Sequence, residues 1–222
     1  MDKKKLVIVY KKAVENKPEL DTFLNHVANQ TGARTITNLK NPTTAVKKVL
    51  TKQQESPGRN YTLDKVNDIA RGRLIYNSLK QLRSGIATFK KDLGKTDMKI
   101  AKTDDFFDHP EDGYEGYHID VIFPNGQHSE IQFHTINSYA ATLATHPLHE
   151  NADHEEMTKA DKLKNEDINK QTQQLDPQSA AQVAQMLEQR NAPATQQAQQ
   201  AAQQTAQGNP PPMSAPQMGG QA

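Results

Sequence analysis

Apolar residues recur at helical spacing in three early segments of the chain, which predicts three amphipathic helices. The first is expected to begin after Asn16 at Pro18 and to end at Gly32, and its apolar face comprises Leu20, Phe23, Leu24, Val27 and Ala28. The second begins at Asn41-Pro42, and its apolar positions are Ala45, Val46, Val49 and Leu50. The third follows a cap at Asn77 or Ser78 and ends at Gly94, and its inward positions are Leu79, Leu82, Ile86, Phe89 and Leu93.

Strand patterns lie between and after these helices. Single strands are predicted at 34–39, at 67–76 and around Met98 and Ile100, and a short helix is predicted at 135–147. Residues 116–123 and 127–133 alternate in polarity around the turn Pro124-Asn125-Gly126, which predicts a hairpin. On its two strands, the polar faces carry His118 and Asp120, and Glu130 and Gln132. Such a polar face on a central hairpin indicates a working surface.

Composition divides the chain of 222 residues into three parts. All six Tyr and all six Phe lie between Tyr10 and Tyr139, so the folded domain is expected at 1–150. Residues 151–190 predict a polar helical extension whose apolar residues are too sparse for a second core, although they could pack on the domain or on a second copy. Residues 191–222 carry no charge and consist mainly of Ala, Gln and Pro, which predicts a disordered tail.

Missing residue types and motifs narrow the classes of function. The chain has 0 Cys, which excludes disulfides, a thiolate nucleophile and Cys-ligated metals. Neither a G-x-x-x-x-G-K-[ST] loop nor a G-x-G-x-x-G loop occurs in the sequence. The net charge of +1 provides no bulk attraction to nucleic acid or an anionic membrane. The apolar run Leu6–Tyr10 is too short for a membrane span or a signal peptide, so we expect a cytoplasmic protein.

Two carboxylates, Asp68 and Glu130, stand inside strand patterns. Each either faces solvent on the open side of a sheet or holds a divalent cation. Mg²⁺ needs only one or two carboxylates together with phosphate oxygens, so two acids from adjacent strands would suffice. The helix that begins at Pro42, with lysines nearby, also offers a phosphate site. These residues alone leave both interpretations open.

Four blocks, in this order, resemble the synthetase domain of the RelA/SpoT family. Residues 38–48 (NLKNPTTAVKK) are similar to R-x-K-x-P-x-S-x-x-x-K, and residues 66–73 (VNDIARGR) are similar to D-I-A-G-x-R. Residues 113–118 (GYEGYH) resemble G-Y-R-G-x-H, and residues 130–135 (EIQFHT) resemble E-[IV]-Q-[IL]-R-T. The resemblance covers roughly residues 20–150 and is most specific in the last two blocks. No H…HD hydrolase pattern precedes it, so the chain is similar to the small, single-domain alarmone synthetases.

This resemblance implies an α+β fold with a nucleotidyltransferase-like mixed β-sheet flanked by helices. It also implies a pyrophosphokinase that transfers pyrophosphate from ATP to the 3′-hydroxyl of GDP or GTP, makes (p)ppGpp and releases AMP. Asp68 and Glu130 would be catalytic and would bind Mg²⁺, and Glu130 would also orient or deprotonate the 3′-hydroxyl. The positions implied in ATP binding are Lys40, Thr44, Lys48 and Arg73. The positions implied in binding the acceptor nucleotide are Tyr114, which would stack on the base, His118, which would contact phosphate, and Gln132.

Several positions depart from the family pattern. Asn38 and His134 each stand where arginine is common, and the loop 108–112 is acidic where many members have lysine. Acidic residues there would repel a highly phosphorylated acceptor. Three alternatives therefore remain: transfer to an adenine nucleotide or a tRNA 3′ end, a catalytically inactive module that binds nucleotide or RNA, and an adaptor that acts through its tail. A homo-oligomer is possible, and no membrane partner is expected.

Overall fold

A single mixed sheet organises the computed structural model, which describes residues 2–56, 58, 61–152 and 158–212. The strands follow the order β1-β2-β5-β4-β3, and β2 and β5 pair in parallel while the other neighbours are antiparallel. Their bounds are β1 (Arg34–Leu39), β2 (Ala70–Tyr76), β3 (Lys99–Asp105), β4 (Tyr117–Ile122) and β5 (His128–Thr135). The predicted hairpin is β4 and β5.

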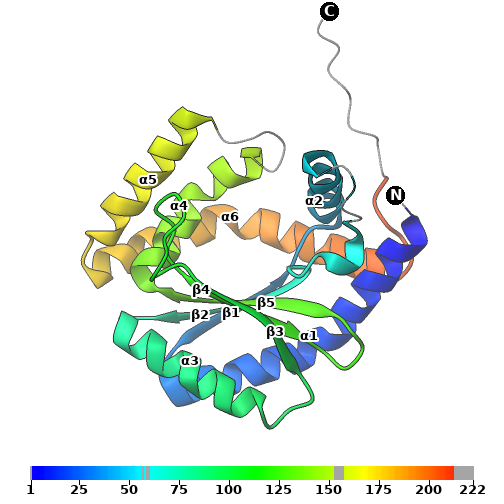
Figure 1. The fold of residues 1–222 in the computed structure, drawn as a ribbon, viewed down its shortest axis with the longest axis horizontal. Helices are drawn as coiled ribbons and strands as arrows, with labels where there is room; N and C mark the ends of the chain where they lie inside the picture. Colours follow the sequence, from blue (N-terminus) through cyan, green and yellow to red (C-terminus); the bar gives the residue numbers. More distant parts are fainter. Residues whose placement is uncertain (1, 57, 59–60, 153–157, 213–222) are drawn as a thin grey trace, which may run out of the picture.

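Helices flank both faces of the sheet (Figure 1). On one face lie α1 (Lys3–Thr31) and α3 (Leu79–Leu93). On the other side lie α2 (Pro42–Glu55), α4 (Ile136–Ala152), α5 (Lys159–Gln173) and α6 (Pro177–Ala206). A short 3-10 helix, η1 (Leu63–Lys65), precedes β2. The predicted α+β fold with a mixed sheet flanked by helices is thereby confirmed.

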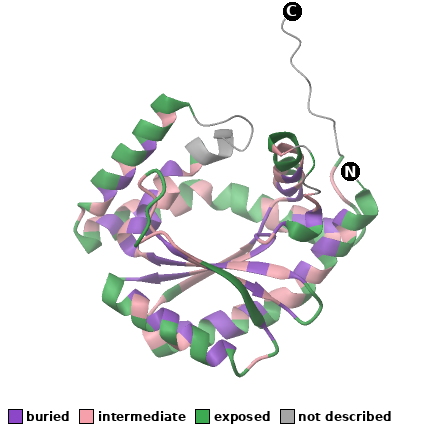
Figure 2. Ribbon diagram, viewed as in Figure 1, coloured by how far each residue is buried: buried purple, intermediate pink, exposed green. Residues whose placement is uncertain are grey.

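The main hydrophobic core lies between the sheet and the helices α1 and α3, and Figure 2 shows the buried residues concentrated in the sheet and on the inner helix faces. Alternate strand residues supply it, and those on the three central strands include Leu74, Ile119, Ile131 and Phe133. Gly72 lies so close to α1 that a Cβ there would fall 2.2 Å from Leu24 Cδ1. A smaller cluster on the opposite face joins β2 to α4 and α6 through Ile75, Ile136, Tyr139, Ala140, Ala180 and Ala184.

The local signals for α2, α3 and the hairpin act as the sequence indicates. Asn41 caps α2 by accepting a hydrogen bond from Thr43 N, and Ser78 caps α3 by accepting one from Gln81 N. Gly94 ends α3, and Gly126 occupies the left-handed region (φ 79°) in the hairpin turn. Each of these residues satisfies an orphan backbone group or permits a reversal, so local chemistry alone sets the boundary.

The first helix begins earlier than its proline suggests. It starts at Lys3, where Asp2 accepts a hydrogen bond from Lys4 N, and it passes through Pro18 without ending. The added turns bury Leu6, Val9, Tyr10 and Ala13, whose helical spacing continues the core face. Burial of this face therefore outweighs the missing amide of Pro18. The expected start at Pro18 is wrong.

The last helix continues beyond the expected start of the disordered tail. Residues 191–206 form the second half of α6, although no charged residue occurs there. Alanine and glutamine are good helix formers, and the fully buried Ala202 belongs to the main core, where α6 packs against α1. The prediction of disorder is wrong for 191–206, and residues 213–222 lie outside the described residues. None of the described helices is long and apolar enough to cross a membrane.

The contact between α6 and α1 can be tested with a buried charge. We expect Ala202→Glu to lower the free energy of unfolding by about 2–4 kcal/mol, because it overpacks the interface and buries an unpaired carboxylate. Urea denaturation followed by circular dichroism measures the change. The control is Gln203→Glu on the exposed face of the same turn, for which we expect a change within about 0.5 kcal/mol. Equal stabilities for the two variants would contradict the packing of α6.

Candidate active site

A buried carboxylate paired with two lysines marks one end of the site. Asp68 is only 6% exposed and lies just before β2, not inside a strand as the sequence suggests. Lys40, which follows β1, donates a hydrogen bond to Asp68 Oδ2 at 2.8 Å. Lys48, on α2, places its Nζ 3.1 Å from Asp68 Oδ1. Three segments distant in the sequence therefore meet at one carboxylate.

These cations determine how Asp68 ionises. Burial by itself would raise the pKa of Asp68, but the positive charges of Lys40, Lys48 and Arg71 outweigh it and hold the pKa well below its usual range. Burial lowers the pKa of Lys40 against the attraction of Asp68. The pKa of Lys48 is raised despite its burial, because Asp68 acts on it most strongly and Glu130 acts in the same direction. The negative charges of both predicted catalytic acids therefore act on the pKa of Lys48.

The remaining candidates lie on the sheet face opposite α1 and α3, in two cross-strand rows. In the first row Arg71 on β2 is the register partner of Glu130 on β5, which is the partner of Asp120 on β4. The second row is Arg73, Gln132 and His118. Register partners project from the same face of a sheet. The strands therefore bring Glu130, Gln132, Arg73 and His118 together on one face of the sheet.

A chain of polar contacts runs along and between these rows. Arg73 Nε donates to Gln132 Oε1 at 2.8 Å, and Gln132 Nε2 donates to Glu130 Oε2 at 2.5 Å. Glu130 Oε1 lies 4.0 Å from His118 Nδ1, and His118 Nε2 lies 2.6 Å from the Tyr114 hydroxyl. The carboxylate of Glu130 is consequently oriented from one side by an amide and faces an imidazole on the other.

Tyr114 and His118 occupy a mostly desolvated aromatic corner. Burial raises the pKa of Tyr114, and Glu130 raises it further, so the phenol keeps its proton. Burial lowers the pKa of His118 although Glu130 opposes the shift, so the ring is neutral near pH 7. Phe106 packs edge-on against both rings, at 5.3 Å from Tyr114 and 5.1 Å from His118. Tyr114 is thus held beside the polar rows by one hydrogen bond and by ring contacts.

His134, which replaces an arginine of the family pattern, points into the protein. It is fully buried, its Nδ1 lies 3.3 Å from Ser138 Oγ, and its ring packs edge-on against Tyr114 at 6.0 Å. Burial lowers the pKa of His134 well below its usual range, so the ring supplies no charge to the site. Its contribution is to support the aromatic corner.

Asp120 is a site residue that the resemblance did not include. His128 Nδ1 lies 3.0 and 3.1 Å from its two oxygens, and Asn67 forms a further hydrogen bond to it. Burial raises the pKa of Asp120, and the neighbouring Glu130 adds to the shift. The alternation of polar residues along 116–123 placed Asp120 on this face. It gave no indication that Asp120 stands beside Glu130, because the sequence of one strand does not reveal its register with the next.

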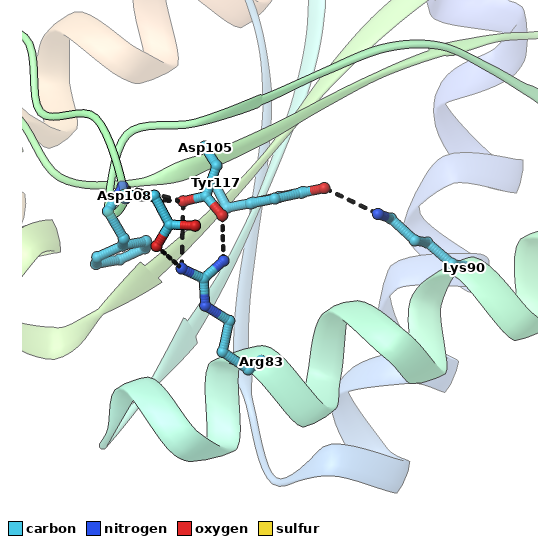
Figure 3. Close-up of polar contacts among 6 residues, drawn as sticks. Arg83, Lys90, Asp105, Asp108 and Tyr117 are labelled. Atoms are coloured by element: carbon cyan, nitrogen blue, oxygen red, sulfur yellow. Dashed lines mark hydrogen bonds and ion pairs between the residues drawn. The ribbon is translucent and has the colours of Figure 1, made fainter.

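The acidic loop after β3 is partly neutralised by α3 (Figure 3). Arg83 forms a short ion pair with Asp105 and donates to Asp108 Oδ1 at 2.8 Å. Further along α3, Lys90 Nζ donates to the Tyr117 hydroxyl at 2.8 Å. The exposed Glu111 and Asp112 remain beyond these contacts. The repulsion expected from the loop 108–112 is therefore reduced at Asp108.

Thr44 and Asn38 border the basic end of the site. Thr44 lies in the first turn of α2, and Asn38 is the register partner of Arg71 in the first cross-strand row. Asn38 thus extends that row to five strand positions without adding charge: Asn38, Arg71, Glu130, Asp120 and Lys102. Lys102 in turn forms an ion pair of 2.9 Å with Asp104.

The donor set fits Mg²⁺ only together with the phosphates of a nucleotide. Within the described residues, no group of three or more His, Asp or Glu could hold a metal by itself. Asp68 Oδ1 is buried, and its close polar neighbour is the ammonium of Lys48 at 3.1 Å, which does not meet it in good hydrogen-bond geometry. This oxygen could become a hard ligand for Mg²⁺ if Lys48 turned to a phosphate. The two lysines on Asp68 would oppose a bare cation, but an incoming triphosphate would draw them away.

Comparisons with known proteins give one consistent result. No family model matches the sequence, and no curated protein matches it. The small alarmone synthetase 1 of Bacillus subtilis bound to its product pppGpp has a similar structure, with a TM-score of 0.58, 20% identity and coverage of 80% of this chain and 94% of that chain. The same protein bound to AMPCPP gives a TM-score of 0.52, 17% identity and coverage of 84% and 97%.

A third solved structure belongs to a different biological setting. The complex between the Type VI effector Tas1 and its immunity protein gives a TM-score of 0.53 and 18% identity, and covers 81% of this chain and 97% of that chain. All three likenesses extend over most of this chain. At these identities they establish the architecture, and the chain has the fold of the small alarmone synthetases.

Proposed function

We propose that this chain is a pyrophosphokinase that transfers the β,γ-pyrophosphate of ATP to the 3′-hydroxyl of a guanine nucleotide and releases AMP. The observation that carries the proposal is the convergence of four cationic side chains with two acids on the side of the sheet opposite α1 and α3. The cations are Lys40, Lys48, Arg71 and Arg73, and the acids are Asp68 and Glu130. The shared fold with an alarmone synthetase bound to pppGpp supports the choice of reaction.

The basic end of the site suits a triphosphate. Lys40 follows the end of β1 and Lys48 lies on α2. Both ammonium groups already pair with the carboxylate of Asp68. Transfer of a phosphoryl group requires mainly in-line positioning and neutralisation of charge, with little covalent chemistry from the protein. We therefore assign Lys40, Lys48 and Arg73 to the ATP phosphates, with Thr44 in the first turn of α2 beside them.

Glu130 is the residue best placed to manage the proton of the acceptor. Its carboxylate is fixed by Gln132 and faces His118. In the reaction, the 3′-oxygen forms a bond to the β-phosphorus, the bond from that phosphorus to the oxygen shared with the α-phosphate breaks, and AMP leaves. The hydroxyl proton passes to Glu130. Asp68 and Glu130 would hold Mg²⁺, which when bound would neutralise charge on the phosphate oxygens.

Tyr114, His118 and Gln132 form the acceptor side of the proposed site. The ring of Tyr114 offers an aromatic surface for a base, and stacking on such a ring contributes about 1–3 kcal/mol per base. His118 is neutral near pH 7, so it would act toward the acceptor as a hydrogen-bonding group and not as a cation.

The second candidate is the same transfer to an adenine nucleotide. Acidic residues on and after β3 disfavour an acceptor with many phosphates whichever base it carries, so they leave the base of the acceptor open. These residues are Asp104, Asp105, Asp108, Glu111 and Asp112. A tRNA 3′ end lacks support: the ammonium of Lys102 already pairs with Asp104 at this edge.

The function is tested by incubating the protein with Mg²⁺, labelled ATP and either GDP, GTP, ATP or deacylated tRNA. We expect AMP and a labelled guanine nucleotide. Glu130→Gln should lower kcat by at least about 100-fold, since general base catalysis typically contributes that much or more. Asp68→Asn should cause a loss of similar size.

Glu15→Gln provides the matched control, because Glu15 is an exposed carboxylate of α1 distant from the sheet face. We expect it to retain full activity. A labelled 3′-pyrophosphorylated product that forms with ATP as acceptor, and not with GDP or GTP, would select the second candidate. Nucleotide binding without AMP from any acceptor would overturn the assignment as an enzyme and leave a binding module.

A comparison of two lysines on α2 can distinguish a specific role in ATP binding from an effect of overall surface charge. Lys48 pairs with Asp68, whereas Lys52, one turn later, pairs with the exposed Glu55. We expect Lys48→Ala to raise the KM for ATP by about tenfold, which corresponds to losing one charge-assisted contact of about 1.4 kcal/mol. Lys52→Ala should leave it within twofold. Equal effects of the two substitutions would show that only overall charge matters.

A further inference from the structure

The buried face of α5 is polar. The residues that it buries are Asn165, Asn169 and Thr172, while Leu163 on the same helix is 58% exposed. A helix on the surface of a domain normally buries apolar residues and exposes polar ones. A stripe of buried amides therefore requires hydrogen-bond partners, because an unpaired buried amide is costly.

The buried Asn165 and the half-buried Gln173 find their partners in backbone carbonyls of the loop that carries Tyr114. Asn165 Nδ2 donates to Asp112 O at 2.9 Å, and Gln173 Nε2 donates to Gly113 O at 3.4 Å. Asn169 Nδ2 donates to Asn165 O at 2.9 Å within the helix. Figure 1 shows α5 beside α4 on the side of the sheet that carries the polar rows. The two residues immediately before Tyr114 are thus attached to α5.

The loop lies directly on the helix and turns sharply through two successive residues. Asp112 and Gly113 have φ of 48° and 78°, and the left-handed region is one that aspartate tolerates better than most residues and glycine adopts freely. A Cβ at Gly113 would lie 3.2 Å from Glu166 Cα and 3.3 Å from Asn169 Cβ. Contact this close to the helix leaves the backbone before Tyr114 little freedom to move.

We propose that α5 is a clamp that positions Tyr114 for the acceptor nucleotide, with Asn165 and Gln173 as positioning residues. The proposal rests on the proposed function and deepens it, because it assigns the specificity of the acceptor side to a helix outside the four sequence blocks. Two anchors define the position of Tyr114: α5 holds the preceding backbone, and His118 holds the hydroxyl. Loss of the first anchor leaves the ring held by its hydroxyl and by its edge-on ring contacts.

The clamp acts on one substrate and not on the other. Lys40 and Lys48 reach Asp68 from the end of β1 and from α2, which do not include the loop 106–116. Release of the clamp should therefore weaken binding of the acceptor while leaving the binding of ATP intact. If α5 served only to stabilise the fold, its disruption would weaken the binding of both substrates to a similar extent.

Kinetics of Asn165→Ala provide the first test. We expect the KM for the guanine nucleotide to rise about tenfold, equivalent to about 1.4 kcal/mol, with the KM for ATP within twofold of wild type. Gln173→Ala should cause a smaller rise of the same kind, and it serves if Asn165→Ala does not fold. The control is Gln171→Ala on the exposed face, whose side chain donates to Asp167 of its own helix. Equal rises in both KM values would overturn the clamp.

Amide hydrogen exchange provides a second readout that needs no turnover. The backbone amides of Tyr114 and Phe106, which donate to Glu111 O and Gly116 O, report on the loop. We expect Asn165→Ala to accelerate exchange over 106–116 by about tenfold, while strands β2 and β5 and the Gln171→Ala variant exchange as in wild type. Unchanged exchange over 106–116 would overturn the clamp. Absence of AMP from the wild-type protein would instead overturn the proposed function, and exchange would then decide the clamp alone.

Discussion

The carboxylate of Asp68 is buried with two ammonium groups, and this arrangement connects three parts of the fold. A buried ion is stable only when partners compensate the lost hydration, so the turn before β2 must remain in contact with the end of β1 and with α2. The hydroxyl of the buried Tyr10 adds a fourth connection by donating to Lys40 O at 2.9 Å. Helix α1 is thereby linked to the same corner. Structure and proposed chemistry depend on the same charges.

From this corner the charge changes along the sheet. Lys40, Lys48 and Arg71 stand at one end, and Glu130 and Asp120 occupy the middle. At the other edge β3 carries Asp104, which pairs with Lys102, and Asp105. Adjacent strands carry successive parts of this order, so the register of the sheet determines which charges are neighbours. A triphosphate suits the basic edge, and an acceptor with fewer charges suits the other.

Much of this arrangement is visible in the sequence where local chemistry decides it. Ser78, Gly94 and the Pro124-Asn125-Gly126 turn specify boundaries by satisfying or reversing the backbone nearby. The start of α1 and the end of α6 were not predictable in this way, because Pro18 and the Ala- and Gln-rich segment 191–206 are overridden by packing of distant residues such as Ala202.

The candidate site shows the same division. Glu130, Gln132 and His118 share a face because strands alternate, and that alternation can be read from the sequence. The ion pairs of Asp68, the position of Asp120 beside Glu130 and the neutralisation of Asp108 by Arg83 each join segments far apart in the chain. The contact between Asn165 and the loop before Tyr114 spans 53 residues and leaves no local pattern. Contacts of this kind can be identified only from the tertiary structure.

The central claim is that Asp68 holds Lys40 and Lys48 ready for the phosphates of ATP. The most direct test is a crystal structure of the protein with Mg²⁺ and AMPCPP. The account predicts that the Nζ atoms of Lys40 and Lys48 lie within hydrogen-bond distance of phosphate oxygens and that Asp68 faces the metal. A nucleotide bound elsewhere, with both lysines still paired to Asp68, would contradict it.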